Sequence, residues 1–194
     1  MQTHYTDQQL DALRELANIG SGTAGTALSS MLGRPVDISV PTAAALPLEQ
    51  AVEVAGPADE PVTAAVLPIV GDMNATVLLL FPPEDAVTLC GMLGVDADTE
   101  EGFSALGEIG NILGASYVGA LGQMVGLELE PCPPQTALDM LGAIVASVLL
   151  MRGEADVALI LDSELVVEGE SCCLSFMLLP EAGGVNDLLA RLGL

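Results

Sequence analysis

The chain has 194 residues, of which 51% are apolar, enough for one domain with a hydrophobic core or for two small fused halves. Only four basic residues, all arginine, stand against 27 acidic ones, and the net charge of -23 repels nucleic acids and anionic lipid surfaces. Polyanions are therefore excluded as partners.

The sequence lacks the usual patterns of a metal site, a disulfide framework and a membrane-spanning segment. The four cysteines form no Cys-x-x-Cys pair and His4 is the only histidine, so neither a zinc site nor a disulfide framework has its required spacing. The N-terminus is polar and acidic, unlike a secretory signal, and the longest apolar run, residues 140–151, is shorter than the roughly 20 residues of a membrane span. We expect a soluble cytoplasmic protein with free thiols and no metal of its own.

The first predicted element is a long helix over residues 8–32. Apolar residues recur there at three- and four-residue steps, Asp7 can cap the start, and Gly33 ends the helix. Residues 36–40 predict a short strand. The segment that follows, up to Pro61, is rich in proline and acidic residues and predicts a loop.

A hairpin and a short helix complete the first half. Residues 62–70 and 75–81 are rich in β-branched and other apolar residues, which predicts two strands. The intervening Gly-Asp-Met-Asn at 71–74 predicts the turn that joins them. Two prolines end the second strand, and residues 84–93 predict the helix.

The same order of elements then begins again. Residues 99–125 predict a second long helix, 127–134 a short extended exit, and 155–167 with 170–179 a second strand pair. Over positions 11–41, ten of the 31 residues recur identically 93 positions later. This similarity indicates an internal repeat.

The repeat predicts the architecture. We expect a single α+β domain made of two repeats, at about 8–95 and 99–194, with pseudo-two-fold symmetry. Each half is too apolar on its inner face to be stable alone, so both strand pairs should form one mostly antiparallel sheet with the two long helices packed on it. Because the two-fold arrangement is built within one chain, a monomer is expected.

The first long helix contains Gly20-x-Gly22-x-x-Gly25, the spacing of a dinucleotide-binding loop. That fingerprint needs a strand directly before the first glycine, whereas residues 10–19 have a helical period. The second copy, at 110–118, lacks the glycine triplet. A nucleotide site is therefore not expected. We interpret Gly20 as a core-side packing residue, and Gly22 and Gly25 as small residues on the exposed side.

Both long helices retain a glutamate followed three residues later by an asparagine. These pairs are Glu15 with Asn18 and Glu108 with Asn111. At 100° per residue, each pair projects side by side from the polar stripe of its helix. Asparagine inside a helix costs up to ~0.7 kcal/mol relative to alanine, yet it occurs mid-helix twice. Ordinary solvated residues, or a duplication inherited without a duplicated function, are the alternative explanations.

The full pattern is [Asp/Ser]-x3-Glu-x2-Asn-x22-Pro, and it resembles the signature of the CheC, FliY and CheX family of chemotaxis phosphatases. It occurs as Asp11, Glu15, Asn18 and Pro41, and again as Ser104, Glu108, Asn111 and Pro134. Two complete motifs fit the CheC branch better than CheX, in which one motif works. The resemblance implies hydrolysis of the aspartyl phosphate on the two-component response regulator CheY, with CheD as a second partner.

The motif residues have no activated nucleophile, metal cluster or basic residue beside them, so the missing parts would come from the phosphorylated receiver domain, which carries Mg²⁺ and a lysine. By this resemblance, Asn18 and Asn111 orient the attacking water, and Glu15 and Glu108 dock the receiver lysine. The other motif residues are interpreted as structural support; they are Asp11, Pro41, Ser104 and Pro134. A non-catalytic adaptor that binds a receiver domain or CheD is the competing hypothesis.

Overall fold

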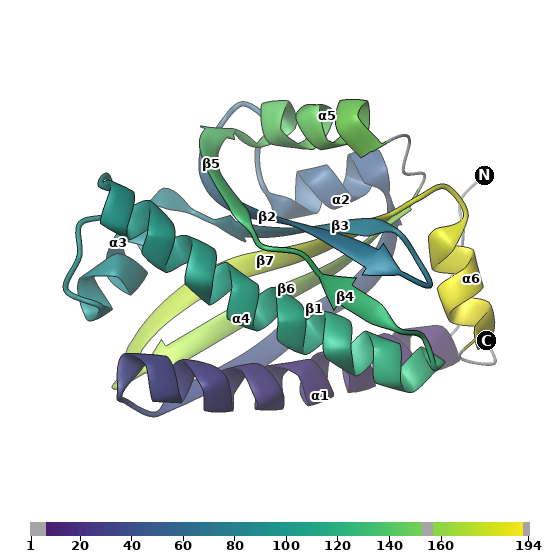
Figure 1. The fold of residues 1–194 in the computed structure, drawn as a ribbon, viewed down its shortest axis with the longest axis horizontal. Coiled ribbons are helices and arrows are strands. Elements are labelled where there is room, and N and C mark those ends of the chain that lie inside the picture. Colours follow the sequence, from purple (N-terminus) through teal and green to yellow (C-terminus); the bar gives the residue numbers. More distant parts are fainter. Residues whose placement is uncertain (1–6, 153–156, 192–194) are drawn as a thin grey trace.

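The computed structural model describes residues 7–152 and 157–191 (Figure 1). The first part of the chain forms α1 (Asp7–Leu32), β1 (Val36–Pro47), α2 (Leu48–Ala55), β2 (Pro61–Gly71), β3 (Ala75–Phe81) and α3 (Pro83–Met92). The second part forms α4 (Glu100–Val125), β4 (Leu129–Pro131), β5 (Gln135–Met140), α5 (Leu141–Arg152), β6 (Val157–Val167), β7 (Glu170–Pro180) and α6 (Gly184–Arg191).

The long helices, the two hairpins and α3 lie within two residues of their predicted bounds, apart from residues 155–156, which are outside the described residues. The loop predicted between 41 and 61 is wrong. There β1 continues to Pro47 because its apolar Ala-Ala-Ala-Leu segment pairs with β6, and α2 follows directly. The proline and acidic content concealed an amphipathic helix with Leu48, Ala51, Val52 and Ala55 on one side.

All strand pairings are antiparallel, in the order β1-β6-β7-β3-β2-β4, with β5 also paired to β2. The β2–β3 and β6–β7 hairpins meet at the centre of the sheet through β3 and β7. At the two ends, β1 pairs with the second hairpin, whereas β4 and β5 pair with the first. Each part of the chain thus completes the hairpin of the other part. The α+β sheet expected from both strand pairs is confirmed; the division at 8–95 and 99–194 stays a prediction.

Helices cover both faces of the sheet. The helices α1 and α4 lie side by side on one face, and α2 and α5 lie on the other (Figure 1). Every residue of β3 is buried: Val77 and Leu79 face α1 and α4, whereas Leu78 and Leu80 face α2 and α5. A strand buried on both sides has a nearly continuous apolar sequence, as β3 has apart from Thr76.

The two long helices meet where Tyr117 of α4 lies against Gly20 of α1. A Cβ at Gly20 would overlap the tyrosine ring. The ring packs edge-on to Phe176 at a centroid distance of 5.1 Å, and its hydroxyl shares a buried 2.9 Å hydrogen bond with Ser163 of β6. Burial raises the pKa of Tyr117, so the hydroxyl stays protonated. One side chain therefore joins both helices to the sheet.

The other two glycines of the triplet differ from each other. Gly22 is exposed and has open space around it, as expected. The exposed position expected for Gly25 is wrong: it is buried, and a Cβ there would lie 3.1 Å from the carbonyl oxygen of Val36. The triplet thus serves close packing at two of its three positions.

Gly20→Ala should destabilise the protein by about 1–3 kcal/mol, because the added methyl group displaces the hydrogen-bonded Tyr117 ring. Gly22→Ala is the matched control and should stabilise it by about 0.5–1 kcal/mol through helix propensity alone. Urea unfolding of both variants measures the difference. Equal stabilisation by the two substitutions would show that the Gly20–Tyr117 contact does not constrain the helices.

Candidate functional site

The four predicted catalytic residues lie on the outward side of the paired helices, away from the sheet. Glu15 and Asn18 of α1 are exposed, as is Glu108 of α4, whereas Asn111 is half-buried. The opposite side of each helix is buried against the sheet, through Leu16, Gly20 and Ala24 in α1 and through Leu106, Ile109, Leu113 and Tyr117 in α4. The outward polar stripe expected from the sequence is therefore present on both helices.

The ends of the two helices place the motifs alike. Each helix ends at a glycine in the left-handed region, Gly33 with φ 66° and Gly126 with φ 67°, where other residues are strained. At the start of α4, the Thr99 hydroxyl accepts a 3.1 Å hydrogen bond from the Gly102 amide. The glutamate and asparagine thus stand at matching positions relative to the end of each helix.

A basic residue lies beside the first motif, contrary to the expectation from sequence. Arg14 donates to the Asp11 carboxylate at 2.9 Å, and both side chains are mostly exposed. Arg14 also stands one turn before Asn18, on the same side of the helix. The second helix has the buried Gly107 at the equivalent position, where a Cβ would lie 2.8 Å from the hydroxyl oxygen of Thr136. The chain has only four basic residues, so the spacing of Arg14 to Asn18 could have drawn attention to it.

Pro41 lies in an irregularity of β1 rather than at the helix surface. Ser39 is opposite Glu164 and Thr42 is opposite Asp162, so two residues of β1 stand where β6 has only Ser163. Proline has no amide hydrogen to give to the ladder, and a β-bulge is a position where it is tolerated. The bulge lies opposite the serine that binds the Tyr117 hydroxyl.

Pro134 occupies the same kind of place in the second part of the chain. Pro131 is opposite Ile69 and Gln135 is opposite Val66, so the segment between β4 and β5 has one residue more than β2. Ser104, the fourth support residue with Asp11, Pro41 and Pro134, is exposed on the first turns of α4. The positions of both prolines favour a role in shaping the strand that follows each motif helix.

Three of the four cysteines are not activated as nucleophiles. Burial raises the pKa of Cys172 to about 11 and also raises the pKa of Cys90. Partial desolvation raises the pKa of Cys173 as well, and the nearby carboxylates, Asp85 first among them, add to the effect. These three thiols are therefore protonated at neutral pH.

Residues 7–152 and 157–191 contain neither a metal-binding cluster nor a membrane-spanning helix. In these ranges no group of three or more His, Cys, Asp or Glu side chains could hold a metal ion. None of the helices described there is both long and apolar enough to cross a membrane.

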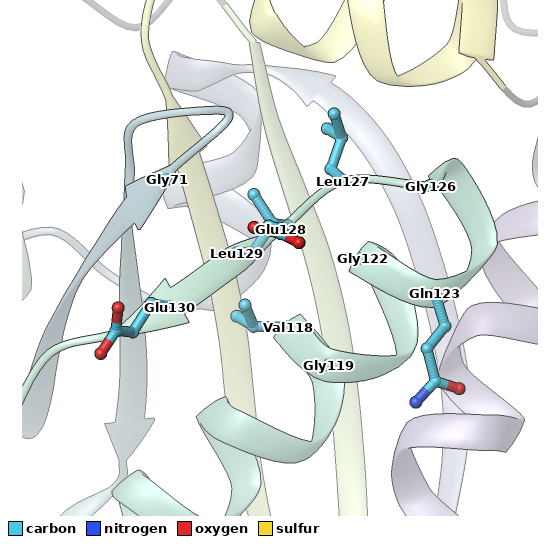
Figure 2. A pocket seen from close by; sticks show the side chains of 10 residues that line it. All are labelled: Gly71, Val118, Gly119, Gly122, Gln123, Gly126, Leu127, Glu128, Leu129 and Glu130. Carbon is cyan, nitrogen blue, oxygen red and sulfur yellow. The ribbon is translucent and has the colours of Figure 1, made fainter.

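Two hollows among the described residues are separate from the motif residues. One, of about 510 Å³, lies between the end of α4 and β4 (Figure 2), and the other, of about 490 Å³, lies beside α6. Neither is lined by Glu15, Asn18, Glu108 or Asn111. The motif side chains instead project from the outer surface of two helices, a geometry suited to contact with another macromolecule.

Comparison with known proteins assigns the fold and the motif to one family. The model of the CheC-like family matches residues 9–44 and 101–137, and these two segments contain all eight motif residues. The CheY-P phosphatase CheC of Bacillus subtilis is 31% identical over 96% of this chain and 95% of its own. The chain belongs to the CheC-like family, which confirms the resemblance drawn from the motif.

Solved structures share the fold at lower sequence identity. FliY of Thermotoga maritima superposes with a TM-score of 0.73 at 20% identity, covering 97% of this chain and 98% of that one. The FliM middle domain of H. pylori gives a TM-score of 0.71 at 13% identity, covering 96% and 99%. The antiparallel sheet with paired long helices is therefore common to all three chains.

Asn18→Ala and Asn111→Ala should each raise the free energy of unfolding by about 0.5 kcal/mol, because alanine is the better helix former at an outward position. Urea unfolding of both variants checks this. A loss of stability above about 1 kcal/mol would instead assign the asparagine a structural role.

Proposed function

We propose that this protein hydrolyses the aspartyl phosphate of a phosphorylated CheY-like response regulator, with one catalytic asparagine on each long helix. The proposal rests on one observation: α1 and α4 present the same Glu-x-x-Asn pair outward at matching positions. It is supported by family membership and by the name of the B. subtilis relative, a CheY-P phosphatase.

Asn18 or Asn111 would enter the phosphorylated site of the receiver and orient one water molecule in line with the phosphorus. A carboxamide both donates and accepts hydrogen bonds but is no base at neutral pH, so its contribution is orientation. The water oxygen bonds to phosphorus as the bond to the aspartate oxygen breaks, which leaves inorganic phosphate and a free carboxylate. Mg²⁺ bound by the receiver would supply positive charge to the phosphoryl oxygens.

Glu15 or Glu108, one turn before the asparagine, would pair with the receiver lysine and set how deeply the asparagine inserts. Both carboxylates are exposed in the free protein, so they are available to a docking partner. Docking removes water from the pair, which makes its geometry count for more than that of a surface ion pair.

The two sites differ in their surroundings. Asn18 is exposed and has Arg14 one turn away, whereas Asn111 is half-buried and has Gly107 there. The Arg14 guanidinium would attract the phosphoryl dianion to the first site. By the family resemblance CheD is a second partner, and because each chain carries both sites the active form is a monomer.

A non-catalytic adaptor remains the second candidate. The observation that favours it is the fold shared with the FliM middle domain, which is not named as a phosphatase. An adaptor would use the same helix surfaces to hold a receiver domain without hydrolysing its phosphate.

Asn18→Ala and Asn111→Ala should each lower the hydrolysis rate at their own site by about 10²–10³, by analogy with the loss of one preorganised catalytic donor. The measurement is the decay of the phosphorylated cognate receiver with each single variant and with the double variant. Asn74→Ala, at an exposed asparagine in the turn after β2, is the matched control and should behave as the parent. A double variant that is as active as the parent would contradict the mechanism.

Turnover separates the enzyme from the adaptor. With the phosphorylated receiver in large excess, the parent protein should release many phosphates per chain, since the reaction consumes water and the phosphorylated receiver but regenerates the parent protein. Phosphate release no faster than the spontaneous decay of the phosphorylated receiver alone would assign the adaptor function.

A further inference from the structure

The hollow of about 510 Å³ lies between the last turns of α4 and the segment 127–130, and the end of β2 closes it at Gly71. Figure 2 shows the helix on one side and this segment on the other. Gly119 and Gly126 have open space around them on the helix side, whereas the backbone at Leu127 packs closely against Gly122. We call this hollow the α4 groove.

The wall opposite the helix is fixed in place. The Asp72 amide donates to the Glu128 carbonyl oxygen at 2.9 Å, and the Glu128 amide donates to the Asp72 carboxylate at 2.9 Å. Gly71, with φ 123°, allows this approach, because a Cβ there would overlap the Glu128 carbonyl. The wall of the α4 groove formed by the segment 127–130 is thus held in place by the end of β2.

The first part of the chain has side chains at the equivalent positions. Ser29 of α1 stands where α4 has Gly122, and its hydroxyl accepts from the Val36 amide at 2.9 Å and donates to the Gly25 carbonyl oxygen at 2.6 Å. Thr26 stands where α4 has Gly119. The two motif helices therefore differ in the space beside their ends, although the motifs themselves match.

The α4 groove can be reached from the Asn18 site. Tyr117 meets Gly20 where the helices cross, so Asn18 and the exposed Gly119 are each two residues from that contact. A protein interface of ordinary size covers about 800 Å² on each partner, more than enough to span both. Gly119 has no side chain to stand in the way.

The lining indicates what the α4 groove would bind. Glu128 and Glu130 are exposed on one wall, and none of the ten lining residues is basic. Half-buried Leu129 provides carbon surface beside them, whereas Val118 is 1% exposed and the Leu127 side chain points away from the helix (Figure 2). A long side chain with an alkyl stem and a cationic head matches both features, since the stem can lie on apolar surface while the head reaches the carboxylates.

We propose that the α4 groove receives a lysine or arginine side chain of the phosphorylated receiver domain bound at Asn18. This inference rests on the proposed function and deepens it, because it makes the Asn18 site the tighter-binding of the two. The Asn111 site has Ser29 and Thr26 at the equivalent place and lacks this contact.

The test measures hydrolysis at one site at a time. In the Asn111→Ala background, where only the Asn18 site works, Glu128→Lys with Glu130→Lys should raise the KM for the phosphorylated receiver about tenfold or more and leave kcat unchanged. Gly119→Leu, which adds a bulky side chain at a position where a Cβ meets no atom within 4 Å, should do the same. In the Asn18→Ala background neither change should exceed that of the control Glu53→Lys, an exposed glutamate on α2 across the sheet. Equal KM changes for the groove and control variants in both backgrounds would overturn the proposal.

A binding measurement separates the two proposals. The Asn18→Ala/Asn111→Ala protein should still bind the phosphorylated receiver, and its Kd should rise with the Glu128 and Glu130 reversals. If the parent fails to hydrolyse but this Kd responds, the phosphatase proposal fails and the groove proposal holds. If the parent hydrolyses the phosphate but this Kd does not change, the groove proposal fails and the phosphatase proposal holds.

The occupant is tested by charge exchange. Changing one receiver lysine or arginine to glutamate should weaken the binding of the receiver to the parent protein. The same receiver variant should bind more tightly to the Glu128→Lys/Glu130→Lys protein. If no receiver substitution is rescued, the proposal is wrong about the occupant. If the reversals instead change the oligomeric state of this protein, the α4 groove belongs to a second copy of the chain, which also overturns it.

Discussion

The structure depends on one contact, in which a tyrosine of α4 fits against a helix position of α1 that has no side chain. Tyr117 needs the space at Gly20, packs edge-on to Phe176 and shares a hydrogen bond with Ser163 inside the core. Since Ser163 lies opposite the bulge that contains Pro41, the same contact links both motif helices to the strand that follows the first motif. The separation of the two outward surfaces is thereby determined by a buried residue that takes no part in chemistry.

The outward surfaces are chemically incomplete. A glutamate and an asparagine on a helix cannot cleave a phosphate bond by themselves, and the three thiols with raised pKa values are protonated at neutral pH. Incompleteness gives specificity, because hydrolysis would occur only when a partner brings the phosphoryl group, its metal ion and a lysine together. A free phosphate ester in solution offers none of that geometry.

Much of this could be predicted from the sequence. The long helices, the hairpins and the outward position of Glu15, Asn18 and Glu108 follow from periodicity, which is a local signal. The extension of β1 and the presence of α2 could not be predicted in this way, because they depend on pairing with β6, more than a hundred residues later in the chain. The same limit applies to Gly25, whose neighbour is a backbone carbonyl of β1, and to the α4 groove, which depends on how β4 approaches the helix.

The exchange of outer strands between the two parts of the chain has a consequence for folding. Val36 pairs with Val167 and Pro47 with Val157, so β1 has no partner until β6 has been synthesised. Forming contacts between residues this far apart in sequence has a high cost in loop-closure entropy, which slows the folding of a domain. On the ribosome, an apolar strand would remain unpaired while most of the chain is made, so the duplicated architecture brings a period of vulnerability to aggregation that a sheet formed from sequential strands would avoid.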